Sequence, residues 1–224
     1  MIALDHLVIG AHTLEEGVAW CKNTLGITPG PGGQHAWMGT HNRLFSIASE
    51  RFPKAYAEII AVDPSAPPPS RTRWFDLDDP RLQAALTRGP QLIHWVARTP
   101  DINAQLSMLR QHGCDGGEAM PAERETPRGL LRWRISVRPD GRRLCEGALP
   151  TWIAWGEVHP TDHMPASGVE LDGLSLSGIP VGALATMALP TGVGATAKVG
   201  DPALQITLTM PHGRVMLSST SRWV

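Results

Sequence analysis

Residues 4–9 read Leu-Asp-His-Leu-Val-Ile, and this stretch decides the fold because its pattern returns at residues 92–97 as Leu-Ile-His-Trp-Val-Ala. In each copy, alternate positions suit the two faces of a β-strand. A histidine, His6 or His94, occupies the same place in both copies. The chain therefore contains an internal repeat, and each repeat opens with a strand.

A helix is predicted after each of these strands. The first helix begins at Thr13, which forms a capping box with Glu16, and it ends at Gly26. The second helix is expected to be capped by Thr99, with a proline at its first position, and to stop at Gly113. A strand followed by a helix is thus the first part of each repeat.

Strands rather than further helices follow each predicted helix. We expect them at residues 34–37, 43–48 and 55–62 in the first copy, and at residues 118–124, 130–138 and 150–155 in the second. A third, fainter copy has a strand at residues 171–176, a helix at 180–189 and a hairpin at 204–218, and Gly173 lies there at the place of the histidines. The pattern predicts an α+β protein of tandem βαβββ modules, with a divergent third partial repeat at the C-terminus.

One linker separates the two clear modules. Residues 63–70 are rich in proline, and residues 74–88 are predicted to add a short helix. The predicted divisions are a first module, a linker with the short helix, a second module and a degenerate third repeat packed on the same domain, at residues 1–64, 65–90, 91–158 and 159–224.

The composition disfavours several classes of protein. The chain has 224 residues and a formal net charge of −1. No overall electrostatic field therefore favours nucleic acid or a membrane as a partner. The chain lacks a run of about 18 apolar residues, and no basic, cleavable leader opens the sequence, so we expect a cytoplasmic protein. The three cysteines are scattered without a CxxC pair, which argues against a disulfide framework and a thiolate zinc site.

Strand alternation assigns each side chain either to the face that carries the helix or to the opposite, inner face. By this rule His6, Glu58 and His94 all lie on the inner face, between apolar neighbours. A lone buried polar group costs several kcal/mol unless it is paired. Their convergence therefore indicates a metal, a substrate or pairing with one another.

Residues 32–44 carry the pattern GGxHxxxGTHNxL. Together with the strands at residues 4–8 and 56–61, this pattern resembles the glyoxalase-like domain of the vicinal-oxygen-chelate superfamily. Residues 73–78 and 149–155 are also similar to that family, so the resemblance covers most of the chain. It implies paired βαβββ modules that form an open mixed-sheet barrel around one site, and it implies a homodimer.

In that superfamily, metal ligands usually come from the first and last strand of each module. Carried over to this sequence, the resemblance implies His6 and Glu58 from the first module and His94 from the second as ligands. Such a set suits a divalent ion of Fe, Mn, Zn, Co or Ni. The fourth position falls on the strand at residues 150–155, which offers no good ligand. The alternative is a hydrogen-bonded polar cluster that lines a pocket without metal, and no organic cofactor is expected.

Three more polar residues are candidates for the same pocket. His35 and Asn42 are predicted to bind substrate, and His41 to move a proton beside Glu58, since histidine titrates near neutral pH. The competing interpretation is a turn whose side chains satisfy local backbone groups. The family resemblance favours the functional interpretation for His41 and Asn42.

Seven arginines lie between Arg124 and Arg143. If Trp133 and its alternating neighbours pack on the second helix, Arg132 and Arg134 face inward. There they would bind a carboxylate or phosphate of the substrate by forked hydrogen bonds. A solvated hairpin face is the competing interpretation.

Eight tryptophans are many for a chain of this length. Four of them could wall a pocket for a flat or apolar ligand, namely Trp37, Trp95, Trp152 and Trp155. Trp152 is the one predicted to bind substrate. Packing in the core is the competing and more frequent role of tryptophan.

Two functions remain open. The first is a divalent-metal-dependent small-molecule enzyme of the lyase, isomerase or dioxygenase type, acting on a small oxygenated or anionic substrate. In this hypothesis a metal held by His6, His94 and Glu58 chelates adjacent substrate oxygens and stabilises an oxyanion, and Glu58 or His41 moves a proton. The second is a metal-free protein of the same fold that binds or sequesters a small molecule. The sequence has no P-loop, GxSxG or nicotinamide-binding pattern, and the fold alone does not identify a reaction.

Overall fold

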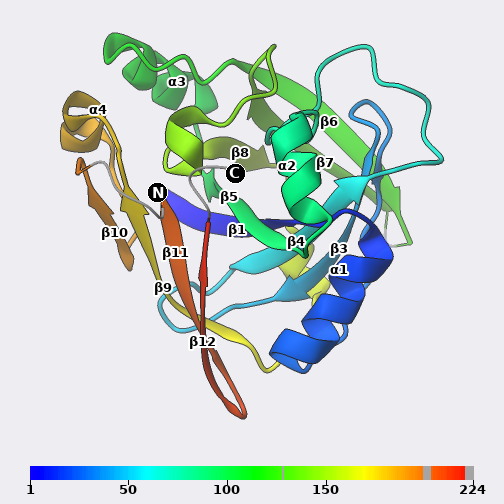
Figure 1. The fold of residues 1–224 in the computed structure, drawn as a ribbon. Coiled ribbons are helices and arrows are strands. Elements are labelled where there is room, and N and C mark those ends of the chain that lie inside the picture. The colour runs from blue at the N-terminus through cyan, green and yellow to red at the C-terminus, as the bar shows by residue number, and fades with distance from the viewer. Residues whose placement is uncertain (128, 199–202, 220–224) are drawn as a thin grey trace.

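The structure of the protein is a computed structural model that describes residues 1–127, 129–198 and 203–219. Within these residues, eight strands form one mixed sheet that curls nearly into a barrel, and four more strands form a second sheet (Figure 1). The strand order in the large sheet is β2-β3-β4-β1-β5-β8-β7-β6. The predicted α+β class with paired βαβββ modules around an open barrel is confirmed.

The two modules share one topology. The first consists of β1 (Ala3–Gly10), α1 (Leu14–Trp20) with a π-helical turn at Cys21–Leu25, β2 (Gln34–His35), β3 (Thr40–Ser46) and β4 (Tyr56–Val62). The second consists of β5 (Gln91–Arg98), α3 (Ile102–Gln111), β6 (Glu118–Thr126), β7 (Gly129–Val137) and β8 (Thr151–Trp155). In each module the last strand pairs in parallel with the first. The opening strands β1 and β5 pair antiparallel at the centre, so the sheet is continuous across both modules.

The helix caps follow the local sequence. Thr13 accepts a hydrogen bond of 3.2 Å from the backbone N–H of Glu16, as the capping pattern predicts. The predicted cap Thr99 is wrong by two residues, because Asp101 precedes α3 and accepts a bond of 3.0 Å from the N–H of Ala104. Aspartate is the stronger N-cap of the two residue types. In the described part of the chain, no helix has the length and apolar character needed to span a membrane.

The third repeat keeps the element order but changes the pairing. It consists of β9 (Glu170–Ser177), α4 (Val181–Thr186), β10 (Val193–Thr196), β11 (Leu204–Met210) and β12 (Gly213–Ser218). Here β9 lies inside its sheet, parallel to β10 on one side and antiparallel to β11 on the other. The predicted hairpin at residues 204–218 is present as β11 and β12.

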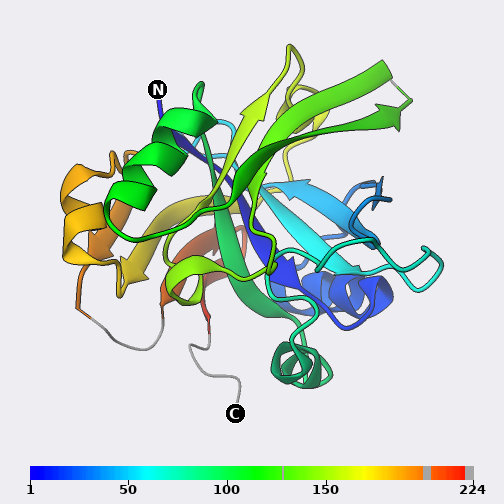
Figure 2. The ribbon, with the colours of Figure 1, turned by 90° about the horizontal axis from the view of Figure 1, so that it is seen from above.

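The outer face of the large sheet is covered by α1, α3 and the second sheet (Figures 1 and 2). Apolar side chains of all three share one core with the central strands, represented by Leu7, Ile59, Trp95, Leu106, Leu174 and Ile206. The N–H of Leu171 on β9 donates to the carbonyl of Ile47, just after β3 (3.0 Å). The hydroxyl of Ser49 donates to the carbonyl of Leu171 (2.8 Å). The second sheet is therefore fixed to the barrel by hydrogen bonds as well as by apolar packing.

The segment between the modules fills the inner, concave face. Residues 74–77, which we call the plug, and the helix α2 (Pro80–Leu86) pack against inward side chains of the barrel strands, including Val8, Ile93, Val96 and Leu131. The short helix agrees with the sequence, but the plug was not predicted. Trp74 and Phe75 of the plug line two pockets of the concave face.

The backbone of the plug is strained and anchored. Phe75 and Asp76 have φ values of 60° and 61°, a left-handed conformation that is unfavourable for residues with a Cβ. The Nε of Arg143 donates to one carboxylate oxygen of Asp76 (2.7 Å), and the backbone N–H of Arg143 donates to the other (3.2 Å). Arg143 also donates to the carbonyl of Ile93 on β5. These bonds hold the plug against the central strands.

Candidate functional site

One of the two pockets on the concave face is polar on one side and aromatic on the other. Its polar side chains come from β1–β4 and β6, and they are His6, His35, Asn42, Tyr56, Glu58 and Arg124. Its apolar wall includes Trp74, Leu131, Trp133, Ile135 and Trp155. The pocket, including its open mouth, encloses about 440 Å³. We call it the Glu58 pocket.

Glu58 lies on β4 and is only 5 % exposed. Its Oε1 accepts a short hydrogen bond of 2.6 Å from the Nδ2 of Asn42. Its Oε2 lies 3.7 Å from the Nε2 of His6, which is too long for a direct hydrogen bond. One carboxylate oxygen is therefore fixed by Asn42, and the other faces an imidazole across a gap.

His6 is held in one orientation by the residue before it. The Nδ1 of His6 donates to the Oδ1 of Asp5 at 2.8 Å, because an ionised carboxylate only accepts. In the neutral ring the lone pair is then on Nε2, the atom that faces Glu58. The ring of Tyr56 stacks on His6 with the centroids 4.7 Å apart. Such a carboxylate–histidine pair fixes the tautomer and stabilises the imidazolium when the ring takes up a proton.

Asp5 is completely buried and fully engaged. Its Oδ2 accepts hydrogen bonds from the Nε2 of His159 and the Nε1 of Trp155, each 3.0 Å long. Burial disfavours the charge on Asp5, but the hydrogen bonds from His159 and His6 outweigh it and hold the pKa of the carboxyl well below its usual range. Asp5 is therefore an anion near neutral pH, and it orients His6.

His35 and Tyr56 are neutral members of the pocket. Burial lowers the pKa of His35 to about 4, although the charge of Glu58 acts in the opposite direction. Burial also raises the pKa of Tyr56 well above its ordinary value, and the charges of Asp5 and Glu58 add to the rise. The Nδ2 of Asn42 lies 3.4 Å from the Nε2 of His35, which is consistent with an unprotonated nitrogen there. His35 thus contributes hydrogen bonds rather than charge.

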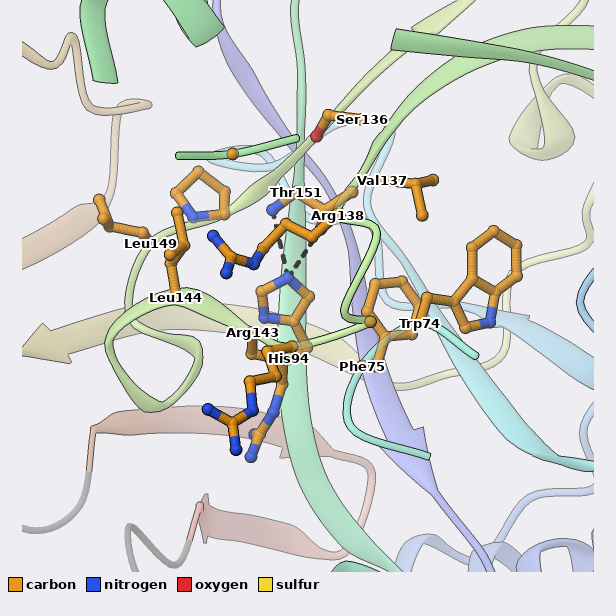
Figure 3. A pocket seen from close by; sticks show the side chains of 14 residues that line it. Trp74, Phe75, His94, Ser136, Val137, Arg138, Arg143, Leu144, Leu149 and Thr151 are labelled. Carbon is orange, nitrogen blue, oxygen red and sulfur yellow. Dashed lines mark hydrogen bonds between the residues drawn. The ribbon is translucent and has the colours of Figure 1, made fainter. Parts of the chain in front are cut away.

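His94 lies in the second pocket, which we call the His94 pocket (Figure 3). The Nε2 of His94 accepts a hydrogen bond from the backbone N–H of Thr151 (3.2 Å) and lies 3.0 Å from the hydroxyl of that residue. The ring of Phe75 is 5.1 Å from the His94 ring. Burial, and then the positive charge of Arg143, hold the pKa of His94 well below its ordinary value. The ring is therefore neutral, and its lone pair is used by Thr151.

The three predicted metal ligands are not brought together. His6 and Glu58 share one pocket, but His94 belongs to the other, and Phe75 of the plug lies between the two pockets. Among the described residues, no group of three or more His, Cys, Asp or Glu side chains is placed to hold a metal ion. The side chains as arranged do not fit the two-histidine, one-carboxylate metal site that the resemblance implies.

The orientation predicted for β7 is wrong. Trp133 and Ile135 line the Glu58 pocket instead of packing on the helix. The side chain of Arg132 is 70 % exposed and pairs with Glu123 (3.3 Å), and Arg134 is also exposed. At β7 the inner face of the barrel is itself apolar, so alternation of apolar residues does not distinguish it from the face that carries the helix. Arg132 and Arg134 therefore do not line the pocket.

Two further candidates lie outside the pocket, whereas His35 and Asn42 lie inside it. Trp152 is 1 % exposed and packs in the outer core, and its neighbour Ile153 lines the pocket instead. His41 precedes Asn42 on β3, and successive residues of a strand point to opposite faces. His41 is accordingly absent from the residues that line the described pockets.

Sequence reasoning missed Asp5 and Arg124. A β-bulge between Leu4 and His6 interrupts the alternation of β1, so the position of Asp5 could not be derived from period two. Arg124 lies directly opposite Leu131 in the β6–β7 ladder, and paired residues point to the same face. The correct orientation of β7 would have placed Arg124 in the pocket.

Comparisons with known proteins agree with this architecture. A family described as a glyoxalase-like domain matches residues 4–188, and a comparison with curated proteins gave no match. A hypothetical protein from Staphylococcus aureus is similar in structure, with a TM-score of 0.55 and 13 % identity over 98 % of this chain and 89 % of that one. A Streptomyces coelicolor methylmalonyl-CoA epimerase has a TM-score of 0.44 and 17 % identity over 71 % of this chain and 99 % of that one. The first likeness concerns the fold alone, and the second is too low to indicate a common function.

Proposed function

Because the match spans residues 4–188, the chain belongs to the glyoxalase-like family, and we propose that it is a small-molecule enzyme of the isomerase or lyase type that works by proton transfer. One observation carries this proposal: Glu58 and His6 face each other across 3.7 Å in an open pocket. A general acid or base must lie within reach of the proton that it moves. Because the two side chains lie this close together, we infer that both can act on one substrate bound in the pocket.

The proposed reaction begins at a C–H bond beside a carbonyl group of the substrate. Glu58 takes the proton, and the electron pair of the C–H bond forms an enolate whose charge lies on the former carbonyl oxygen. His6 in its protonated form, stabilised by Asp5, donates a hydrogen bond to that oxygen. Return of the proton from Glu58 to carbon gives the isomer. In the lyase reaction the enolate electrons instead form a double bond to the next carbon, whose substituent leaves with its bonding electron pair and takes up the proton from Glu58.

The other pocket residues support this assignment. Asn42 fixes one oxygen of Glu58 at 2.6 Å, so the second oxygen is directed toward the gap that faces His6. Trp133 and Trp155, whose ring centroids are 5.4 Å apart, form part of an apolar wall opposite the polar residues. Such a wall lowers the local dielectric and strengthens hydrogen bonds to a developing oxyanion. The isomerase and lyase reactions both begin with a proton transfer. That step uses only side chains that the fold brings together, and we therefore prefer these two reaction types among those that the sequence left open.

The test is hydrogen exchange from carbon in D₂O. The protein is incubated with a panel of small 2-oxo acids, 2-hydroxy ketones and malonate half-esters, and loss of the α-proton signal is followed by NMR. We expect exchange with at least one compound, and a loss of about 10²–10⁴-fold in Glu58→Gln. Glu123→Gln, which removes an exposed carboxylate from the β6–β7 hairpin, should leave exchange unchanged.

Exchange that is equally fast in Glu58→Gln would refute the assignment of the base. Binding of panel compounds without any exchange would favour the second function, a protein of the same fold that binds or sequesters a small molecule. The homodimer and the cytoplasmic location implied by the sequence stay predictions, and the oligomeric state is open to sedimentation analysis.

A further inference from the structure

We propose that Arg124 binds a carboxylate of the substrate, so that the Glu58 pocket accepts small carbonyl acids. This inference rests on the proposed function for the reacting atoms and adds an anion site beside them. Arg124 lies on β6 and lines the same pocket as Glu58 and His6.

The position of Arg124 follows from the strand register. It pairs with Leu131 across the β6–β7 hairpin, and Leu131 belongs to the apolar wall of the pocket. The Nη1 of Arg124 lies 3.5 Å from the Oδ1 of Asn42, the residue whose Nδ2 holds Glu58. A carboxylate on Arg124 would thus lie within one small molecule's length of the proposed base.

The guanidinium of Arg124 is poorly satisfied by the protein. Other arginines of this region pair with carboxylates, Arg132 with Glu123 at 3.3 Å and Arg138 with Asp140 at 2.6 Å. Among the described residues no such ion pair is formed by Arg124, its one hydrogen bond is at the 3.5 Å limit, and its buried Nε has no partner. A buried donor without an acceptor is destabilising. A bound carboxylate would supply both the charge and the acceptors.

Gly33 makes room for this side chain. A Cβ placed on Gly33 would lie 2.4 Å from the Nη1 and 2.5 Å from the Cδ of Arg124. The backbone N–H of Gly33 also donates to the Oδ1 of Asn42 (2.8 Å). The loop before β2 is therefore shaped around the guanidinium, and Arg124 is not merely a solvated residue of the hairpin.

A carboxylate suits this site better than a phosphate does. The planar guanidinium can donate two parallel hydrogen bonds to a carboxylate. Only one positive charge is available, and the anionic Glu58 lies on the other side of Asn42. A dianion would be repelled by Glu58 more strongly than a monoanion is.

The experiment compares benzoate with benzamide, which has the same shape without the charge. Binding is measured by tryptophan fluorescence, since several tryptophans wall the pocket, and is repeated by calorimetry. We expect the native protein to prefer benzoate, and Arg124→Gln to weaken benzoate at least about tenfold while leaving benzamide unchanged. Arg132→Gln, which removes an exposed arginine from the same hairpin, should keep the preference. Gly33→Ala, which displaces Arg124 without removing it, should weaken benzoate as well.

Three results would overturn the proposal. They are no binding of benzoate by the native protein, a preference that persists in Arg124→Gln, and a preference lost instead in Arg142→Gln, since Arg142 lines the His94 pocket. Acetate should compete with benzoate more effectively than phosphate does, and the reverse order would contradict the choice of a carboxylate. The binding data are independent of turnover, so failure of the proton-transfer proposal would appear separately, as exchange that is indifferent to Glu58→Gln.

Discussion

Replacing His35 with glutamine is expected to make the stability of the protein less dependent on pH. His35 is buried beside Asn42 and Glu58, and its pKa of about 4 compares with an ordinary value of 6.5 in the unfolded chain. As the pH falls below 6.5, the unfolded chain takes up a proton at this position and the folded protein does not. The contribution of His35 to the free energy of unfolding is therefore fully present above about pH 6.5, and it is lost as the pH falls toward 4.

The size of the effect follows from the two pKa values. Between pH 7 and pH 5, the difference in proton uptake by His35 lowers the free energy of unfolding by about 2 kcal/mol. His94 titrates in the same sense, because its pKa is also lowered by burial, but it is present in both proteins and its effect cancels in the comparison. Asp5 loses its charge only at much lower pH.

The assay is urea denaturation of the native protein and of His35→Gln at pH 7 and at pH 5. Glutamine keeps groups that can bond to Thr40 and Asn42, the partners of the imidazole. Whatever the absolute stability of the variant, it should lose about 2 kcal/mol less than the native protein between the two pH values. Equal losses would mean that His35 is charged in the folded state beside Glu58, and the neutral hydrogen-bonding role argued above would be wrong.

Two further substitutions test the support of the site. Asp5→Asn removes the anion that is hydrogen-bonded to His6 and His159. In urea denaturation at pH 7 it should lower the free energy of unfolding by about 3–5 kcal/mol. A loss below about 1 kcal/mol would contradict the role of Asp5. Trp152→Ala should lower the free energy of unfolding by about 3–5 kcal/mol in the same assay. It should leave the affinity of the folded protein for benzoate unchanged, because Trp152 packs in the outer core. A weakened affinity would instead support the predicted place of Trp152 in the pocket.

The architecture was predictable because two signals coincide. The repeat of the strand that holds His6 and His94 sets the number of modules, and the amphipathic helix after each strand sets which face is outer. In the first module this is enough to place His6, Asn42 and Glu58 on the inner face, where the structure has them. The roles of these residues stay predictions, as do the predicted module boundaries.

The site was only partly predictable because the inner face is not empty. The composition of residues 65–90 indicates a linker. No local sequence pattern indicates that Trp74 and Phe75 enter the barrel and separate the pocket of His94 from that of Glu58. On β7 both faces are bordered by apolar groups, so a pattern of period two has two equivalent solutions and the one chosen was wrong. The bulges in the β1–β5 ladder add a second source of error, since each shifts the alternation by one residue.

The second sheet also bears on how the protein is made. Strands β9–β12 follow the barrel strands in the chain. On the ribosome, the apolar part of the outer face that the second sheet covers is therefore complete before that sheet has been synthesised. At about 5–20 residues per second this interval lasts several seconds. A nascent chain paused before Glu170 is therefore expected to be prone to aggregation and to be recognised by a chaperone that binds apolar surfaces.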